Sequence, residues 1–224
     1  MTIEHIVVAI PARDEEVTLD SCLESVLDAC EASAVPSTVV LVLDSCGDRS
    51  AAIARQYPEV VTIERDYGNV GRARDAAATA GLRLSGGDPE RTWIAFTDAD
   101  TAVPAPWLRA HLSAAAQADA FVGAVVPRLD DLDQARRGVW LRTHPPGATL
   151  GHVHGANLGV RANAYLAVGG VPALTVGEDV DLVARIRAAG YRIAESERHP
   201  VVTSARLEGR APDGYAAYLR EMAS

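Results

Sequence analysis

The sequence RTWIAFTDADT, residues 91–101, joins a run of apolar residues to two aspartates, Asp98 and Asp100, with one alanine between them. The run at 92–97 predicts a buried strand, because it is short, continuous and rich in β-branched and aromatic residues. The two carboxylates repel each other unless something screens them, in a chain whose formal charge is already −9. A solvated strand end explains one of them well. Carboxylates on alternate residues can also turn toward one hard divalent cation, so we expect a metal site here.

Three further apolar runs precede this strand, and a helical pattern follows each of them. The expected strands span 5–10, 37–43 and 59–64, and the expected helices span 15–32, 48–57 and 71–84. Strands that are apolar throughout and separated by helices are typical of a mainly parallel sheet covered on both faces. The sequence therefore predicts an α/β fold.

The alternation becomes less regular after about residue 104. We expect a strand at 119–128, an extended segment at 152–161, and a helix at 178–190 that begins with acids and ends before a glycine. The polar stretch 129–147 has no clear periodicity and ends in HPPG, which predicts a loop.

The composition is that of a globular domain with a substantial core. Hydrophobic residues make up 48% and charged residues 23% of the 224 residues, which is the ordinary balance of such domains. The sequence contains no repeat, low-complexity tract or linker. We therefore expect a single domain, 1–224, with two functional halves at 1–103 and 104–224.

Charge and cysteine content restrict the partners and the compartment. A pI near 5.1 argues against nucleic acid as a partner, because a basic patch is the usual footprint of such binding. No segment approaches the ~18 apolar residues of a membrane span, and the N-terminus predicts a strand rather than a signal peptide. Cys22, Cys30 and Cys46 show no CxxC spacing and are expected to be reduced. The sequence predicts a soluble cytoplasmic protein; peripheral contact with a membrane and a homodimer stay open.

Polar segments follow each of the first four strands. They are PARDEE, DSCGD, GNVGRAR and DAD, and ligands in open α/β sheets bind beyond the carboxyl ends of the strands. Taken singly, acids favour a helix N-terminus and Asp44 could form an Asx-turn. Together these segments bring Arg13, Arg72 and Arg74, whose guanidinium groups match phosphate oxygens, to the acids. The combination predicts a nucleoside diphosphate site, although GNVGR is neither a Walker A loop nor a GxGxxG fingerprint.

Five segments, taken in order, resemble family 2 glycosyltransferases, which have the GT-A fold and use sugar nucleotides. The segments are VVAIPARDEEVTLDSCLESVL (7–27), VLVLDSCGDRS (40–50), GNVGRARDAA (68–77), FTDADT (96–101), and GANLGVRANAYLAVGGV with GEDVDLVARIRAAGY (155–191). The resemblance implies that the half 1–103 binds the nucleotide sugar and that the half 104–224 binds the acceptor and carries catalysis.

The resemblance also assigns individual residues. The positions it gives to the sugar nucleotide are Pro11, Ala12, Arg13, Glu15, Asp44, Ser45, Gly71, Arg72, Asp98, Ala99 and Asp100. Asp98 and Asp100 match the DxD motif that holds Mn²⁺ or Mg²⁺, with Asp98 toward the ribose and Asp100 as the main metal ligand. Asp179 matches the catalytic base of inverting members, and Glu178 precedes it.

The expected reaction is transfer of one sugar, with inversion, from a nucleoside-diphosphate sugar to a small-molecule or lipid-linked hydroxyl acceptor. The Gln-x-x-Arg-Trp motif of processive synthases is missing from the sequence. A sugar-1-phosphate nucleotidyltransferase and a non-catalytic sugar-nucleotide-binding protein remain as alternatives. His199, His152 and His154 are weak candidates for a third metal ligand, and TSAR (203–206) could return Arg206 to the phosphates.

Overall fold

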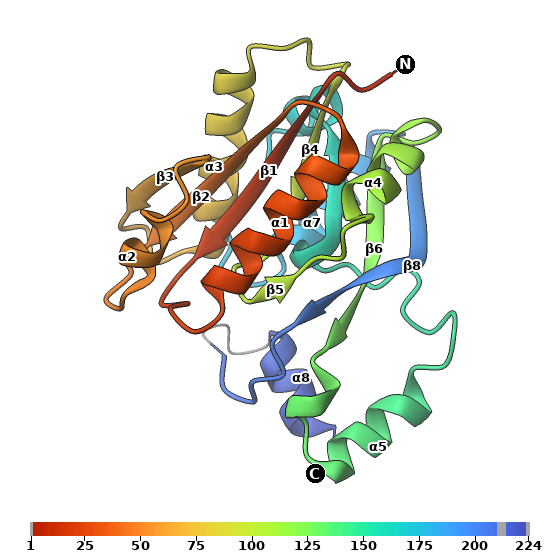
Figure 1. The fold of residues 1–224 in the computed structure, drawn as a ribbon. Helices are drawn as coiled ribbons and strands as arrows, with labels where there is room; N and C mark the ends of the chain where they lie inside the picture. Colours follow the sequence, from red (N-terminus) through yellow and green to blue (C-terminus); the bar gives the residue numbers. More distant parts are fainter. Residues whose placement is uncertain (1, 210–213, 223–224) are drawn as a thin grey trace.

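The computed structural model describes residues 2–209 and 214–222, which form one mixed sheet flanked by helices (Figure 1). Across the described residues the strand order is β3-β2-β1-β4-β7-β6-β8-β5. The strands are β1 (His5–Ala12), β2 (Ser37–Asp44), β3 (Val60–Arg65), β4 (Thr92–Phe96), β5 (Thr101–Ala102), β6 (Ala120–Pro127), β7 (Leu158–Arg161) and β8 (Ile193–Thr203). The helices are α1 (Leu19–Ser33), α2 (Ser50–Ala54), α3 (Val70–Ser85), α4 (Trp107–Ala115), α5 (Gln134–Thr143), α6 (Ala162–Ala167), α7 (Glu178–Ala188) and α8 (Tyr215–Glu221), with 3₁₀ turns at Leu129–Asp131 and Gly155–Asn157.

The first half of the chain builds the parallel part of the sheet, as the sequence predicts. β1 lies between β2 and β4 and pairs in parallel with both, so Val8 lies beside Val39 on one side and Ala95 on the other. β3 adds to β2 in the same direction. The carboxyl ends of these four strands therefore meet at one edge of the sheet, the lower edge in Figure 1.

The second half extends the sheet with mixed pairing. β7 runs antiparallel to β4 and to β6, and β8 then runs parallel to β6. The short β5, which directly follows the two aspartates, pairs with the end of β8. This pairing returns the C-terminal part of the chain to the edge where β1 and β4 end.

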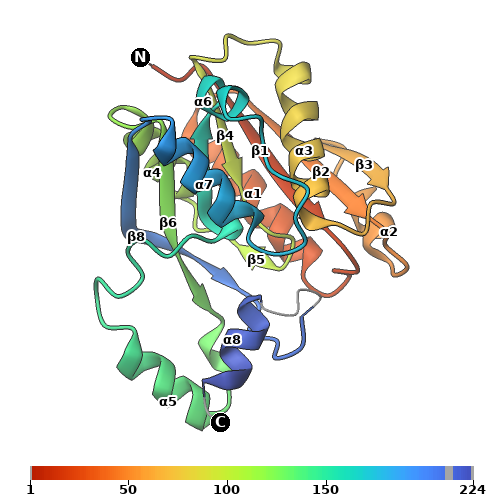
Figure 2. The same cartoon turned by 180° about the vertical axis from the view of Figure 1, so that it is seen from behind.

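Both faces of the sheet are covered, which explains why its strands are apolar without alternation. Ile6 and its neighbours on one face of β1 pack under α1 and α4, while Val7 and its neighbours on the other face pack under α3 and α7. Figures 1 and 2 show these helices on opposite sides of the sheet. Helix α3 lies so close to β1 that a Cβ at Gly81 would come within 2.2 Å of Val7 Cγ1.

A buried polar network lies between α4 and the sheet. Trp93 Nε1 donates to His111 Nδ1 at 3.1 Å, and Asn157 Oδ1 lies 3.2 Å from His111 Nε2 and accepts from Trp107 Nε1 at 3.0 Å. Asn157 in turn donates to the carbonyl of Ala124 at 2.9 Å. All of these side chains are at most 1% exposed, so the network fixes the 3₁₀ turn Gly155–Asn157.

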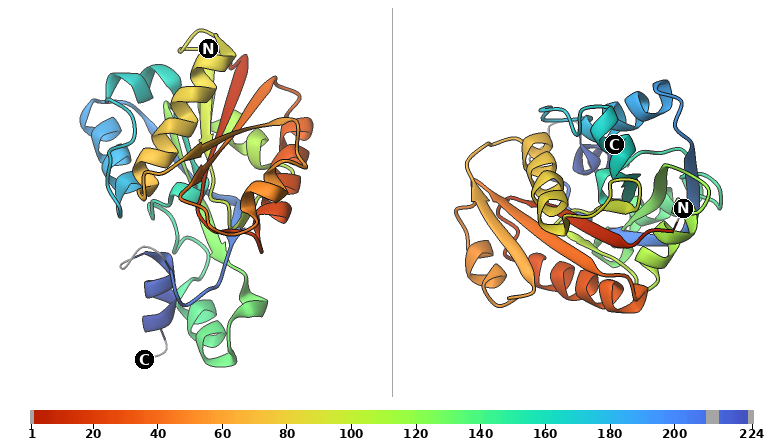
Figure 3. Two further views of the ribbon diagram at one scale, coloured as in Figure 1. Left: turned by 90° about the vertical axis from the view of Figure 1, so that its left-hand side faces the viewer. Right: turned by 90° about the horizontal axis from the view of Figure 1, so that it is seen from above.

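Helices α5 and α8 form an arm below the carboxyl edge of the sheet (Figures 2 and 3). Leu132, Trp140, Ala205 and Leu219 make its small apolar core. The prediction of a loop over 129–147 is wrong for this helix, because α5 buries Trp140 and has no apolar stripe that periodicity could reveal. Its start is fixed instead by Asp133, whose side chain accepts from Arg136 N at 2.9 Å. None of the helices in the described ranges combines the length and apolar character that crossing a bilayer demands.

Candidate functional site

A cleft of about 450 Å³ opens at the carboxyl edge of the sheet, and its lining includes residues of the sheet and of the arm. The ends of β1, β2 and β4, the start of α7 and the start of α8 all contribute to its walls. The predicted residues that line it are Pro11, Ala12, Arg13, Glu15, Asp44, Asp98, Ala99, Asp100, Glu178 and Asp179. The polar strand ends that the sequence places together are therefore brought together by the parallel register.

Asp44 occupies the end of β2 with its side chain turned to a distant loop. One carboxylate oxygen accepts from Tyr67 N at 2.6 Å and Gly68 N at 3.0 Å, and the other accepts from Asn69 N at 2.9 Å. The Asx-turn left open for Asp44 is not what forms; the carboxylate instead shapes the entry to α3. Ser45, with φ 58°, donates to Asp66 at 2.7 Å and is not among the residues that line the cleft.

Gly71 and Arg72 lie away from the cleft. A Cβ at Gly71 would come within 2.1 Å of the carbonyl of Pro172, so this glycine lets a loop cross α3 closely. Arg72 is exposed and lines a separate hollow with Arg65 and Arg83 on the outer side of α3. Residues two apart on a helix point about 200° away from each other, so only one of Arg72 and Arg74 can face the cleft.

Arg74 is the arginine of α3 that faces the cleft, and it is 3% exposed. Its Nη2 lies 2.8 Å from Asp98 Oδ1, its Nε lies 3.3 Å from Glu178 Oε1, and its Nη1 donates to the carbonyl of Gly155 at 3.0 Å. Gly155 allows this approach, because a Cβ there would come within 2.4 Å of Arg74 Nη2. Burial acts to lower the pKa of Arg74, but Asp98 and Glu178 hold it above its ordinary value.

Glu178 and Asp179 begin α7, and they have different surroundings. Glu178 is 5% exposed, and burial raises its pKa although Arg74 opposes the shift. Asp179 is partly exposed in the cleft; Oδ2 accepts from Gly155 N at 2.6 Å and Oδ1 accepts from Val180 N at 2.8 Å. Of the two acids, Asp179 is the one oriented by backbone donors toward open space, whereas Glu178 is held by Arg74.

Asp100 is paired with Arg206, which returns from the end of β8. Arg206 Nη2 lies 3.0 Å from Asp100 Oδ2, and its Nη1 donates to both carboxylate oxygens of Glu15 at 2.8 and 3.0 Å. Burial raises the pKa of Asp100 to about 6, although Arg206 acts to lower it. The β5–β8 pairing that positions Arg206 joins Thr101 to Thr203, so the TSAR segment reaches the cleft as the sequence suggested.

Asp98 and Asp100 offer the hard oxygen donors that Mn²⁺ or Mg²⁺ prefers. Both line the cleft, and each carboxylate already has a cationic partner, Arg74 for Asp98 and Arg206 for Asp100. Burial and the nearby charge of Asp98 raise the pKa of Asp100, so the two carboxylates lie near each other and form an oxygen donor set of the kind that suits a hard divalent ion.

The three candidate histidines are placed differently. His154 lines the cleft against Tyr215, with ring centroids 5.5 Å apart, and burial lowers its pKa. His152 and His199 are exposed and are not among the residues that line the cleft.

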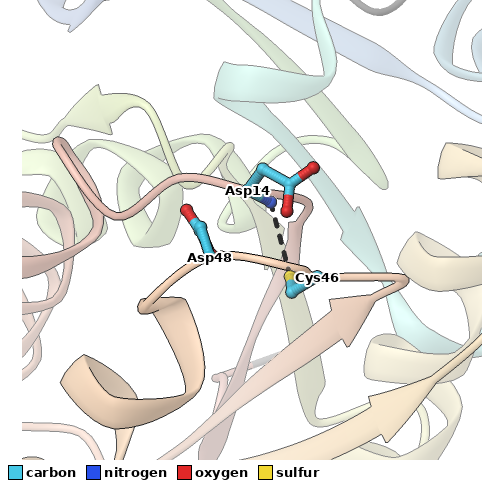
Figure 4. Close-up of side chains that lie close together, drawn as sticks. All are labelled: Asp14, Cys46 and Asp48. Atoms are coloured by element: carbon cyan, nitrogen blue, oxygen red, sulfur yellow. Dashed lines mark hydrogen bonds between the residues drawn. The ribbon is translucent and has the colours of Figure 1, made fainter.

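A second group of possible ligand atoms lies in two neighbouring loops (Figure 4). Oxygen or sulfur atoms of Asp14, Cys46 and Asp48 fall within 4.8 Å of one another. Asp14 accepts from Gly47 N at 2.7 Å, Asp48 accepts from Glu16 N at 2.8 Å, and Cys46 Sγ accepts from Asp14 N at 3.4 Å. These hydrogen bonds join the loop after β1 to the loop after β2, which explains why the three side chains lie close together.

Several residues of the cleft were not predicted as site residues. They include Gly68, Asn69, Val153, Gly155, Thr175, Val176, Val180, Thr203, Ser204, Tyr215 and Ala216. Gly155 carried a signal, because it begins a segment quoted for the family resemblance. Tyr215 follows a stretch with no chemical pattern and reaches the cleft through the packing of α8.

Comparisons with known proteins agree with this architecture. Staphylococcus aureus TarS 1–349 in complex with UDP-GlcNAc has a TM-score of 0.66 at 16% identity, over 95% of this chain and 62% of that one. A mannosyltransferase from Pyrobaculum calidifontis in complex with GDP-Man and Mn²⁺ has a TM-score of 0.64 at 19% identity, over 97% of this chain and 60% of that one. Mycobacterium tuberculosis glucosyl-3-phosphoglycerate synthase with Mn²⁺, UDP-glucose and phosphoglyceric acid has a TM-score of 0.56 at 17% identity, over 91% and 72%.

The chain thus spans about three fifths of the length of the first two structures. A search of curated protein sequences gives no match. The family model for glycosyl transferase family 2 matches residues 7–164, which is most of the chain. The predictions of family and fold are confirmed: the chain belongs to glycosyl transferase family 2 and has the α/β fold of the GT-A glycosyltransferases.

Proposed function

We propose that the protein transfers one sugar from a nucleoside-diphosphate sugar to a hydroxyl acceptor, with inversion and with the help of Mn²⁺ or Mg²⁺. One observation carries the proposal: a continuous chain of hydrogen bonds joins Asp98 to Asp179. Asp98 accepts from Arg74, Arg74 donates to the carbonyl of Gly155, and the N–H of Gly155 donates to Asp179. The proposed donor site and the proposed base are thereby held at a fixed relation.

In this proposal Asp179 takes the proton of the acceptor hydroxyl as that oxygen attacks the anomeric carbon. Each of its oxygens accepts one backbone N–H, from Gly155 or Val180, and a carboxylate oxygen has a further lone pair for the proton. The leaving diphosphate needs no proton of its own, so one base suffices, whereas glycoside hydrolysis uses a pair of carboxyls.

The donor diphosphate would lie against the residues at the ends of β1 and β4. Asp98 and Asp100 would hold the divalent ion, which when bound supplies a Lewis acid for the charge that develops on the leaving group. Arg13 and Arg206 also line the cleft and would offer guanidinium groups to the phosphate oxygens. Arg206 would exchange part of its contact with Asp100 or Glu15 for the diphosphate.

Thermal shift with nucleoside diphosphates, with and without Mn²⁺, tests donor binding, since a ligand that binds the folded state raises its stability. We expect one base to give the largest shift and Mn²⁺ to increase it. Release of nucleoside diphosphate from the matching sugar nucleotide then measures turnover. A nucleotidyltransferase would instead release pyrophosphate from a triphosphate and a sugar phosphate, and that outcome would replace the proposal.

A further inference from the structure

The lining of the cleft is rich in carboxylates. The carboxylates that line it outnumber the guanidinium groups: Glu15, Asp44, Asp98, Asp100, Glu178 and Asp179 stand against Arg13, Arg74 and Arg206. Arg74 is bound to Asp98 and Glu178, and Arg206 to Asp100 and Glu15. Arg74 and Arg206 are therefore each engaged by two carboxylates.

Apolar side chains lie next to Asp179 in the lining of the cleft. Val180 follows Asp179 directly and is 53% exposed, and Val176, three residues before it, is 37% exposed. Val153 and Tyr215 line the same cleft. Among the described lining residues around Asp179, no lysine or arginine is available beyond Arg74, whose three nitrogens are engaged.

His154 belongs to the same wall. Its ring packs edge-on against Tyr215, with ring centroids 5.5 Å apart, and adds a ring surface beside the valines. An acceptor that carried a phosphate or carboxylate beside its hydroxyl would be repelled by Asp179 and Glu178, and Arg74, the arginine nearest to them among the described lining residues, has its donors engaged.

We propose that the acceptor is a neutral alcohol whose hydroxyl is carried on an apolar body, rather than a phosphorylated or carboxylated small molecule. The proposal rests on the proposed function of the same cleft. Val153, Val176, Val180 and Tyr215 contact the apolar body, and the hydroxyl points to Asp179. Exposed valines beside the base then gain burial when the acceptor binds.

The test compares neutral and charged acceptors at a fixed concentration of the donor chosen by thermal shift, with Mn²⁺ present. Octyl β-D-glucopyranoside, below its micellar concentration, probes an alkyl body, and phenyl β-D-glucopyranoside probes an aromatic one. Glucose is the matched acceptor that lacks an apolar body, and glucose 6-phosphate is the matched acceptor that carries a charge. We expect at least a tenfold higher kcat/KM for one of the two apolar glucosides than for glucose, and a lower value for glucose 6-phosphate than for glucose.

Substitution at Val180 links the preference to this wall. For each variant, the kcat/KM for octyl or phenyl glucoside is divided by the kcat/KM for glucose 6-phosphate. Val180→Lys is expected to lower this ratio by tenfold or more. Leu166→Lys in α6 is the matched control, because Leu166 is 55% exposed and does not line the cleft; it should leave the ratio unchanged. If Val180→Lys does not fold, Val180→Thr keeps the shape, replaces a methyl with a hydroxyl, and should lower the ratio several-fold.

The outcomes separate this inference from the proposed function. Equal use of all four acceptors, preference for glucose 6-phosphate, or ratios unchanged in the Val180 variants would overturn the inference. In that case a nucleotide-dependent thermal shift and slow hydrolysis of the donor by water would still support glycosyl transfer. Absence of both the shift and any release of nucleoside diphosphate would overturn the two together.

Discussion

Arg74 and Asp98 form an ion pair of 2.8 Å at the floor of the cleft, with the arginine side chain 3% exposed and the aspartate 33% exposed. The pair joins a residue in the interior of α3 to the carboxyl end of β4. Since Arg74 also contacts Glu178 and Gly155, one guanidinium holds together three segments of the chain. Removal of this group should therefore affect both the stability of the fold and the geometry of the site.

Arg74→Met should destabilise the protein by about 3–5 kcal/mol, because it leaves Glu178 buried without a cation. Urea unfolding measures the loss. Addition of Glu178→Gln to Arg74→Met should recover part of it, because the uncompensated charge is removed. Arg72→Met is the control, since Arg72 is exposed on the other side of α3 and should change stability by less than about 0.5 kcal/mol. Equal losses of unfolding free energy in Arg74→Met and Arg72→Met would contradict the structural role given to Arg74.

Asp179→Asn should lower turnover by a factor of about 10³ or more, because the amide cannot accept the acceptor's proton. The thermal shift from nucleoside diphosphate and Mn²⁺ should persist, since the donor side of the cleft is unchanged. Asp181→Asn is the matched control on the same helical turn: Asp181 pairs with Arg185 at 2.6 Å and does not line the cleft. A variant at Asp179 with turnover near that of Asp181→Asn would remove Asp179 as the base.

Asp100→Asn should separate stability from metal binding. Burial raises the pKa of Asp100 from 3.8 to about 6, so stability is lost as pH rises from about 4 to 6, and the full cost of its ionised form is present at pH 7.5. The variant should therefore unfold at an equal or higher temperature than the natural protein at pH 7.5 when no metal is present. It should also lose the increase in nucleotide-dependent thermal shift that Mn²⁺ gives, and EDTA should have the same effect on the natural protein. A Mn²⁺ response that survives in Asp100→Asn would show that the ion is held elsewhere.

His111 should make the fold sensitive to mild acid. Burial lowers its pKa from 6.5 to about 4, and its Nδ1 accepts from Trp93, so a proton there would face an N–H donor. The unfolded chain binds this proton at a higher pH than the folded chain, so stability is lost as pH falls from about 6.5 toward 4. The loss attributable to His111 approaches roughly 3 kcal/mol at the acid end of this window.

Chemical denaturation at pH 7.5, 6, 5 and 4.5 measures this effect. His111→Gln cannot take up the proton and should reduce the slope of stability against pH in this range, whatever its stability at pH 7.5. His199→Gln, at an exposed position, should leave the slope unchanged. Identical slopes for the natural protein and His111→Gln would contradict the prediction.

The parallel part of the fold could be predicted because its strands carry the signal in consecutive residues. β4 is buried at every position, Thr92–Phe96, so the apolar run itself marks the strand. β8, Ile193–Thr203, was not predicted, because most of its residues are partly or fully exposed and include four charged or ionisable side chains, Glu195, Glu197, Arg198 and His199. Its position depends on pairing with β6, which no local pattern records.

Those residues of the candidate site that belong to a sequence motif or follow a predicted strand could be predicted. Asp98, Asp100 and Asp179 reach the cleft from positions that motifs identify. The choice between Arg72 and Arg74 depends instead on the rotation of α3, which the packing of Gly71 against Pro172 helps to fix. The apolar wall depends on the exposure of Val176 and Val180, which appears only when the loop before α7 is folded.

The antiparallel pairing of β7 with β4 has a consequence for any attempt to divide the chain. Ala95 lies beside Gly159, and Phe96 lies beside Leu158. One edge of β4, the strand that leads to the two aspartates, is therefore hydrogen-bonded to a strand from the second half of the sequence. A fragment that ends at residue 103 would expose the unpaired N–H and C=O groups along this edge of β4, and we expect it to self-associate. Residues 1–103 are therefore not expected to form a stable domain without the residues that follow them.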